Sequence, residues 1–278
     1  MSHSTNSQSH LEKAMEKQNV TENGLRANFY QVNGKQRRVI ICLGGSEGGL
    51  PFADHEAHLQ ALLDLGHPVL CLAYFGVAGL PQSLEKIPLE YFERAFDWLS
   101  RQPDIINEYA IIGGSKGGEL ALLLASRYSQ VKAVIASVPS NVVWQGIPSG
   151  FPRSPLGSSW SYAGNDLPFV PLQFSPALIM GLITHRYRKA YEHALLNKKR
   201  VAQAIIPVEK IGGPVLLISG RKDTLWPSMP MCEQIVNRLA ADPFPYPYQH
   251  VVIGEGHGVQ NVETFWPIVT GFLREHFK

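Results

Sequence analysis

The chain has 278 residues, of which 45% are hydrophobic and 17% are charged, and its formal net charge is +2. This composition is typical of a folded globular protein, and so mild a charge argues against nucleic acid as a partner. No apolar run approaches the ~20 residues that cross a bilayer, and residues 1–18 lack the apolar core of a secretory signal. The three cysteines, Cys42, Cys71 and Cys232, cannot all pair with one another. We therefore expect buried free thiols, no membrane span and a cytoplasmic location.

Strand-like and helical patterns alternate along the first half of the chain. Residues 1–24 are mostly polar, and we predict that they form a flexible tail. Continuous apolar runs, typical of strands buried in a parallel sheet, follow at residues 37–43, 68–75, 109–113 and 131–137. Helical spacing separates these runs, at residues 56–65, 89–100 and 119–127. This order predicts an α/β fold: a mostly parallel sheet with helices on both faces and functional groups at the carboxyl ends of its strands.

The alternation breaks between about residues 140 and 178, where six prolines accompany Trp144 and Trp160. A long loop of this kind is usually a lid or a binding insertion, and a tolerated surface loop is the alternative. Further elements are predicted downstream: helices at residues 190–204, 231–239 and 262–277, and strands at residues 214–219 and 250–253. We therefore predict one domain over residues 25–278, with a lid-like insertion at about residues 140–205.

The sequence Gly-Gly-Ser-Lys-Gly at residues 113–117 has the form of a nucleophile elbow. A G-x-S-x-G sequence between a strand and a helix places the serine on a sharp, strained turn, with its hydroxyl exposed above the sheet. Gly113 and Gly117 lack a Cβ, so the following helix can cross close over the strand. An ordinary glycine-rich connection is the alternative. The strand before the motif and the helix after it favour Ser115 as a nucleophile.

A serine nucleophile needs a base, and the base needs an orienting acid. In the α/β-hydrolase arrangement the acid follows the serine in the chain and the histidine follows the acid. His257 lies in a short glycine-flanked loop beyond a predicted strand, whereas the other downstream histidines do not: His185, His193, His250 and His276. Asp223 directly follows the strand at residues 214–219, and Asp166 and Asp242 are its competitors. The predicted catalytic residues are thus Ser115, Asp223 and His257.

Two backbone amides are expected to hold the oxyanion. One belongs to Lys116, at the start of the helix after the serine, and the other to Ser46, in the glycine-rich loop that follows the first buried strand. This loop could instead hold phosphate, but it has neither the P-loop nor the dinucleotide-binding spacing. Glu47, Trp144 and Trp160 are expected to contact the substrate. We expect no metal and no cofactor.

Several stretches resemble the catalytic domain of the acyl-CoA thioesterase and bile-acid-CoA:amino-acid N-acyltransferase family of α/β hydrolases. They are Gly-Gly-Ser-Glu-Gly-Gly from residue 44, Ala-Tyr-Phe-Gly from 73, Ile-Pro-Leu-Glu-Tyr-Phe from 87, Gly-Gly-Ser-Lys-Gly-Gly-Glu-Leu from 113, and Leu-Trp-Pro from 225, with Gly256-His257. The resemblance covers most of the chain from about Arg38 onward. It implies the same Ser115–Asp223–His257 triad and an acyl-enzyme formed from a thioester. Mammalian relatives carry an N-terminal β-sandwich domain, and the residues before the hydrolase core are too few here to build one.

The resemblance predicts a serine hydrolase that cleaves acyl thioesters, with acyl-CoA as the substrate class. A carboxylesterase or another hydrolase of small esters is the nearest alternative. An acyl-CoA:amino-acid N-acyltransferase is a further one, although the amino-acid-conjugating members resemble this chain but use cysteine, and the serine here favours water as the acceptor. A catalytically silent binding protein on the same scaffold is the alternative outside the enzymes. The expected partner is a small acyl thioester or ester, with homo-oligomerisation left open.

Overall fold

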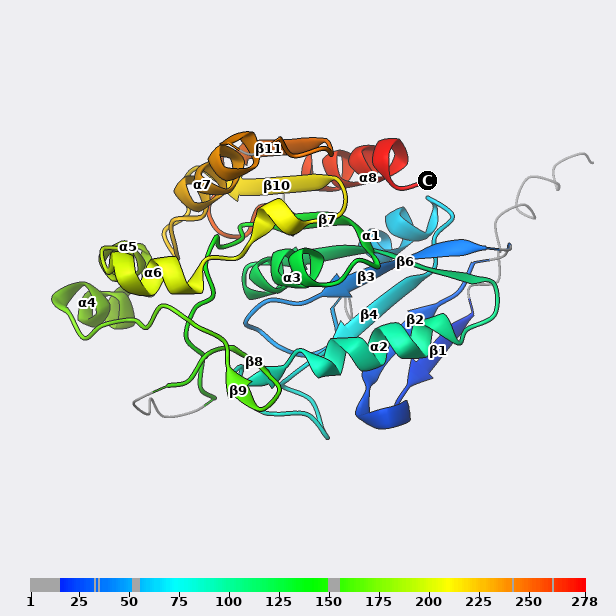
Figure 1. The fold of residues 1–278 in the computed structure, drawn as a ribbon, viewed down its shortest axis with the longest axis horizontal. Helices are drawn as coiled ribbons and strands as arrows, with labels where there is room; N and C mark the ends of the chain where they lie inside the picture. The colour runs from blue at the N-terminus through cyan, green and yellow to red at the C-terminus, as the bar shows by residue number, and fades with distance from the viewer. Residues whose placement is uncertain are drawn as a thin grey trace, which may run out of the picture.

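A large, mostly parallel sheet forms the centre of the molecule (Figure 1). The computed structural model describes residues 16–32, 34, 36–51, 56–149, 156–241, 243–261 and 263–278. The sheet has eight strands in the order β1-β2-β4-β3-β6-β7-β10-β11. They are β1 (Lys17–Val20), β2 (Arg26–Tyr30), β3 (Arg37–Leu43), β4 (Val69–Ala73), β6 (Ile105–Gly114), β7 (Val131–Ser137), β10 (Val215–Gly220) and β11 (Tyr248–Ile253). β1 and β2 are antiparallel to their neighbours, and the other six strands are parallel.

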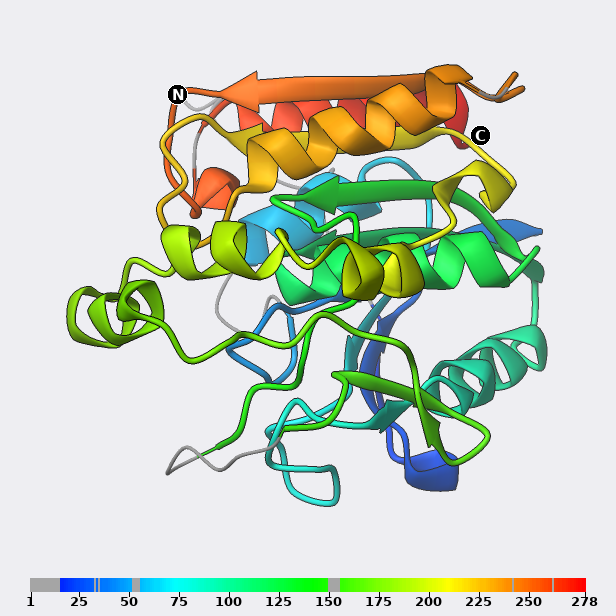
Figure 2. The same cartoon turned by 60° about the vertical axis from the view of Figure 1, so that its left-hand side comes forward.

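Helices cover both faces of this sheet (Figure 2). One face packs against α2 (Glu90–Ser100), α3 (Lys116–Arg127) and α7 (Ser228–Ala241), and the other against α1 (Glu56–Leu63) and α8 (Phe265–His276). Successive side chains of a strand point to opposite faces, so a strand covered on both sides must be apolar throughout. In β3, Ile41 belongs to the core on the α3 side, whereas Ile40 and Cys42 belong to the core on the α8 side. The predicted α/β architecture is therefore confirmed.

The segment between β7 and β10 lies outside the main sheet. It contains β8 (Trp160–Tyr162), β9 (Asn165–Asp166), α4 (Pro176–Thr184), α5 (Arg188–Ala194) and α6 (Lys198–Ala204). β8 pairs with β5 (Ile87–Pro88) and β9 in a separate three-stranded sheet. A third apolar cluster, which includes Trp144, Ala194 and Trp226, packs the segment against the start of α7. Short 3-10 helices are η1 (Glu22–Gly24), η2 (Val208–Lys210) and η3 (Val259–Asn261).

Two predicted elements differ from the structure, and one helix was not predicted. Lys17–Val20, which we predicted as part of a flexible tail, pairs with β2 as β1, and residues 1–15 lie outside the described residues. The helix expected at residues 190–204 is two helices, because the Asn197 side chain accepts the amide of Arg200 and starts α6 afresh. The helix α4 was not predicted. Within the described part of the chain, no helix is both long enough and apolar enough to span a membrane.

Candidate active site

Ser115 occupies the turn between β6 and α3, as predicted. Its φ of 55° and ψ of −118° put a non-glycine residue in a sparsely populated backbone region, which is the strain expected of a nucleophile elbow. A Cβ at Gly113 would lie 2.1 Å from the carbonyl oxygen of Gly117, and a Cβ at Gly117 would lie 2.3 Å from that of Gly44. Only glycine fits at both positions, because α3 crosses β6 and β3 at this close range.

The structure brings Ser115, His257 and Asp223 together in a hydrogen-bonded series. His257 Nε2 lies 2.9 Å from Ser115 Oγ, and His257 Nδ1 lies 2.9 Å from Asp223 Oδ2. Each residue follows the carboxyl end of a parallel strand: β6 for the serine, β10 for the aspartate and β11 for the histidine. With the Nδ1 proton donated to the carboxylate, Nε2 is left as an acceptor for the serine hydroxyl.

Asp223 is held by donors that the sequence did not reveal. Its side chain is 1% exposed, Oδ1 accepts the amides of Leu225 and Trp226 at 2.9 and 3.3 Å, and Oδ2 accepts the Ser228 hydroxyl at 2.7 Å. A buried carboxylate must be paired or hydrogen-bonded, and these bonds also fix the oxygen that faces His257. The indole of Trp226 packs edge-on against the imidazole, with ring centroids 5.7 Å apart.

The competing residues lie elsewhere. Asp166 is exposed on β9, where it accepts the Ser158 amide and pairs with Lys86, and Asp242 lies outside the described residues. Of the competing histidines, His250 is hydrogen-bonded to Ser219 at 2.7 Å. His185 and His193 are exposed, and His276 is at the end of α8.

Of the predicted oxyanion donors, Lys116 begins α3 directly after Ser115, and Ser46 lies on the loop that follows β3. The Lys116 amide is the first of α3, where an N–H group has no helical partner. Gly45 lies close to the serine, because a Cβ on it would be 3.3 Å from Ser115 Cβ. The Glu47 carboxylate accepts the Gly45 amide at 2.6 Å, and its side chain is exposed. The loop at residues 44–47 thus carries the Glu47 carboxylate next to Gly45, which itself approaches Ser115.

The side chain of Lys116 is part of a buried network that sequence reasoning missed. Its Nζ lies 2.6 Å from Glu119 Oε2, and the two side chains are 2% and 0% exposed. Glu119 Oε1 accepts the Trp160 indole N–H at 2.8 Å and the Trp144 amide at 3.2 Å. Burial raises the pKa of Glu119 and lowers that of Lys116, while their mutual attraction opposes both changes. The helix behind the serine is therefore tied directly to the segment between β7 and β10.

Both tryptophans predicted to contact substrate are buried. Trp144 is 1% exposed and packs edge-on against Tyr191, and Trp160 is 0% exposed and packs against Tyr74.

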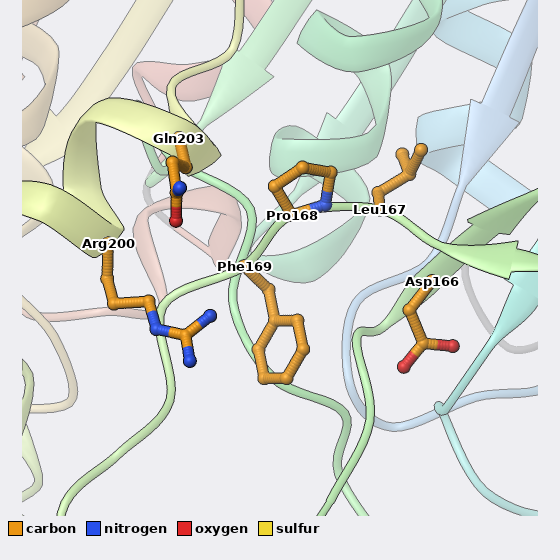
Figure 3. Close-up of a pocket in the computed structure, with 6 residues that line it drawn as sticks. All are labelled: Asp166, Leu167, Pro168, Phe169, Arg200 and Gln203. Carbon is orange, nitrogen blue, oxygen red and sulfur yellow. The ribbon is translucent and has the colours of Figure 1, made fainter.

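A separate pocket of about 430 Å³ lies between β9 and α6 (Figure 3). Its lining residues are Asp166, Leu167, Pro168, Phe169, Arg200 and Gln203, and no member of the Ser115–His257–Asp223 series is among them. We assign no substrate to this pocket.

The fold and this hydrogen-bonded series define an α/β hydrolase. Solved structures of this class superimpose over nearly the whole chain: the Pyrococcus furiosus esterase Pf2001 has a TM-score of 0.58 at 16% identity, covering 95% of this chain and 94% of that one. Acetyl xylan esterase 1 from Thermoanaerobacterium has a TM-score of 0.58 at 13% identity, covering 96% and 89%. Residues 87–261 match the family described as BAAT / Acyl-CoA thioester hydrolase C terminal, and the chain belongs to that family.

Curated relatives from mouse carry two different activities in their names. Acyl-coenzyme A amino acid N-acyltransferase 2 is 34% identical over 72% of this chain and 44% of its own length. The mitochondrial Acyl-coenzyme A thioesterase 2 is 31% identical over 73% of this chain and 40% of its own length. The chain thus matches less than half the length of these relatives.

Proposed function

We propose that this chain is a serine hydrolase of acyl thioesters, with acyl-CoA as its substrate class. The observation that carries the proposal is the series Ser115–His257–Asp223, with 2.9 Å at both contacts and the aspartate buried. Ser115 Oγ attacks the thioester carbonyl carbon while His257 takes the hydroxyl proton and Asp223 stabilises the imidazolium that forms. Collapse of the tetrahedral intermediate breaks the C–S bond, and His257 returns the proton to the leaving sulfur. Water then releases the acid from Ser115 by the same steps.

We assign the oxyanion to the amides of Lys116 and Ser46. Preset donors of this kind stabilise charge that develops only in the transition state. We assign a substrate contact to Glu47, because its carboxylate is exposed on the same loop as Ser46. Trp144 and Trp160 would shape the acyl-binding region from below the protein surface, because both are almost fully buried. These contacts are predictions of the proposal.

Transfer of the acyl group to an amino acid is a second candidate, favoured by the 34% identical mouse relative. The nucleophile argues against it: a serine oxyester is readily hydrolysed, whereas a cysteine thioester suits transfer to an amine.

Three buried free thiols, Cys42, Cys71 and Cys232, support a reducing, cytoplasmic site of action.

Parallel assays test the proposal. A panel of acyl-CoAs of increasing chain length is compared with matched p-nitrophenyl esters, and each acyl-CoA reaction is repeated with glycine or taurine. We expect the acyl-CoA reactions to release free acid and free CoA thiol. At one chain length, kcat/KM should be higher for the acyl-CoA than for the matched p-nitrophenyl ester. Turnover of oxyesters alone would assign a carboxylesterase, and amide products would assign the transferase.

Replacing Asp223 with asparagine is expected to lower kcat about 10⁴-fold, because an amide favours the wrong imidazole tautomer and cannot stabilise the imidazolium. The matched control is Asp166→Asn, which makes the same change in the exposed competitor and is expected to leave kcat unchanged. Steady-state rates on one ester substrate measure both. Equal losses in the two variants would remove Asp223 from the proposed role.

A further inference from the structure

Large apolar side chains are exposed around α4. Of the eight large hydrophobic side chains that are exposed among the described residues, five lie within Phe174–Ile183. These five form what we term the α4 surface: Phe174, Ile179, Met180, Leu182 and Ile183, exposed by 86, 42, 56, 54 and 70%. The sequence of α4, Pro-Ala-Leu-Ile-Met-Gly-Leu-Ile-Thr, contains no charged residue. An exposed apolar patch of this kind marks an interaction surface more often than a free surface.

Positive charge accumulates in the same part of the chain. Residues 167–208 contain six lysines and arginines and one acidic residue, a formal net charge of +5, whereas the whole chain carries +2. The one acidic residue, Glu192, is paired with Arg188 at 2.8 Å. Arg186 and Lys189 are exposed immediately after α4, and α5, which carries Lys189, packs against α4.

The α4 surface lies at the catalytic end of the molecule. The parallel strands end on the side where α4 and α5 are found, and α4 is the outermost helix at that side in both views (Figures 1 and 2). Arg188 connects α5 to the site, because its guanidinium donates to the backbone carbonyl of Asp223 at 3.1 Å. A flat partner that covers α4 would therefore sit at the same end of the sheet as Ser115.

We propose that the α4 surface docks on an anionic lipid bilayer. Apolar side chains on a short helix insert at the boundary between headgroups and acyl chains, and adjacent Lys and Arg bind anionic headgroups. A second copy of the chain fits less well. A two-fold contact would bring the same patch against itself, so Arg186 and Lys189 would face like charges, and Lys is depleted at protein interfaces. Docking does not depend on the proposed thioesterase activity.

Co-sedimentation of the full chain with vesicles tests this inference. We expect binding to phosphatidylcholine vesicles that contain phosphatidylglycerol and weaker binding to pure phosphatidylcholine. High salt should remove the difference between the two kinds of vesicle, because it screens the attraction to the anionic headgroups. Ile179→Ser/Ile183→Ser should weaken binding about tenfold or more, because several buried methylenes are lost. Arg186→Gln/Lys189→Gln should weaken binding to the anionic vesicles about fivefold for each charge, and leave binding to pure phosphatidylcholine unchanged.

Tyr246→Ser is the matched control, because it removes an exposed apolar side chain, 38% exposed, just before β11 begins and hence at the opposite end of the sheet. It should bind vesicles as the unmodified chain does. Hydrolysis of a short soluble ester should be equal in all these variants, which separates docking from catalysis. No co-sedimentation with anionic vesicles would overturn the proposal, as would equal losses in the α4 and Tyr246 variants. A dimer in sedimentation velocity that Ile179→Ser/Ile183→Ser converts to a monomer would assign the surface to a second copy instead.

Discussion

Replacing Ser115 with alanine is expected to lower kcat/KM about 10⁶-fold, on thioesters and oxyesters alike. The hydroxyl is the group that forms the acyl-enzyme, and no other hydroxyl is hydrogen-bonded to His257 among the described residues. His257→Ala should cost about as much, and the double variant should be no worse than either single one, because the two side chains act as one unit. A fluorophosphonate should label the unmodified chain at Ser115, as mass spectrometry of the digested protein would show.

Ser46→Ala is the matched control for this variant. It makes the same change directly after Gly45, which lies close to Ser115, yet it keeps the backbone amide that is proposed to bind the oxyanion. We therefore expect kcat/KM to stay near that of the unmodified chain. Thermal unfolding of all variants shows whether they are folded. A folded Ser115→Ala variant with undiminished turnover would exclude Ser115 as the nucleophile, and a large loss in Ser46→Ala would mean that its hydroxyl, not its amide, acts.

The Ser115 turn could be predicted because its signals are local. Two glycines around a serine, an apolar run before them and a helical pattern after them are all read from one short stretch, and the close approach at Gly113 and Gly117 requires glycine there. The positions of Asp223 and His257 followed from topology, since residues after parallel strands meet at one edge of the sheet. The choice among the competing residues also needed the glycine-flanked loop around His257 and the place of Asp223 directly after a strand.

Contacts between distant parts of the chain and the geometry of individual turns could not be predicted. Lys116 and Glu119 look like exposed residues of a helix, and only the return of Trp144 and Trp160 over α3 buries them. The donors to Asp223 from Leu225 and Ser228 depend on the turn after β10. The helix α4 was missed because Pro176 opens it inside a proline-rich stretch, although proline at the start of a helix is favourable.

Replacing Glu119 with glutamine is expected to lower the free energy of unfolding by about 3–5 kcal/mol. The change keeps the shape and an acceptor for Trp160, but it leaves the Lys116 ammonium at 2% exposure without its counter-charge. Lys116→Met should also destabilise the fold, since it leaves the carboxylate of Glu119 with only the two tryptophan donors. Lys116→Met/Glu119→Leu should cost less than the sum of the single changes, because no buried charge remains. Urea unfolding followed by tryptophan fluorescence measures all three.

Glu192→Gln is the matched control, because Glu192 pairs with Arg188 on the surface of α5 at a similar distance, 2.8 Å against 2.6 Å. An exposed pair contributes about 1 kcal/mol or less, so this variant should unfold almost as the unmodified chain does. Because the same substitution is made in both places, a larger loss of unfolding free energy in Glu119→Gln than in Glu192→Gln is due to the burial of the Lys116–Glu119 pair. Equal unfolding free energies for Glu119→Gln and Glu192→Gln would mean that the Lys116–Glu119 pair does not hold the segment between β7 and β10 against α3. In that case the order of this segment would have to come from its apolar contacts and from the pairing of β8 with β5.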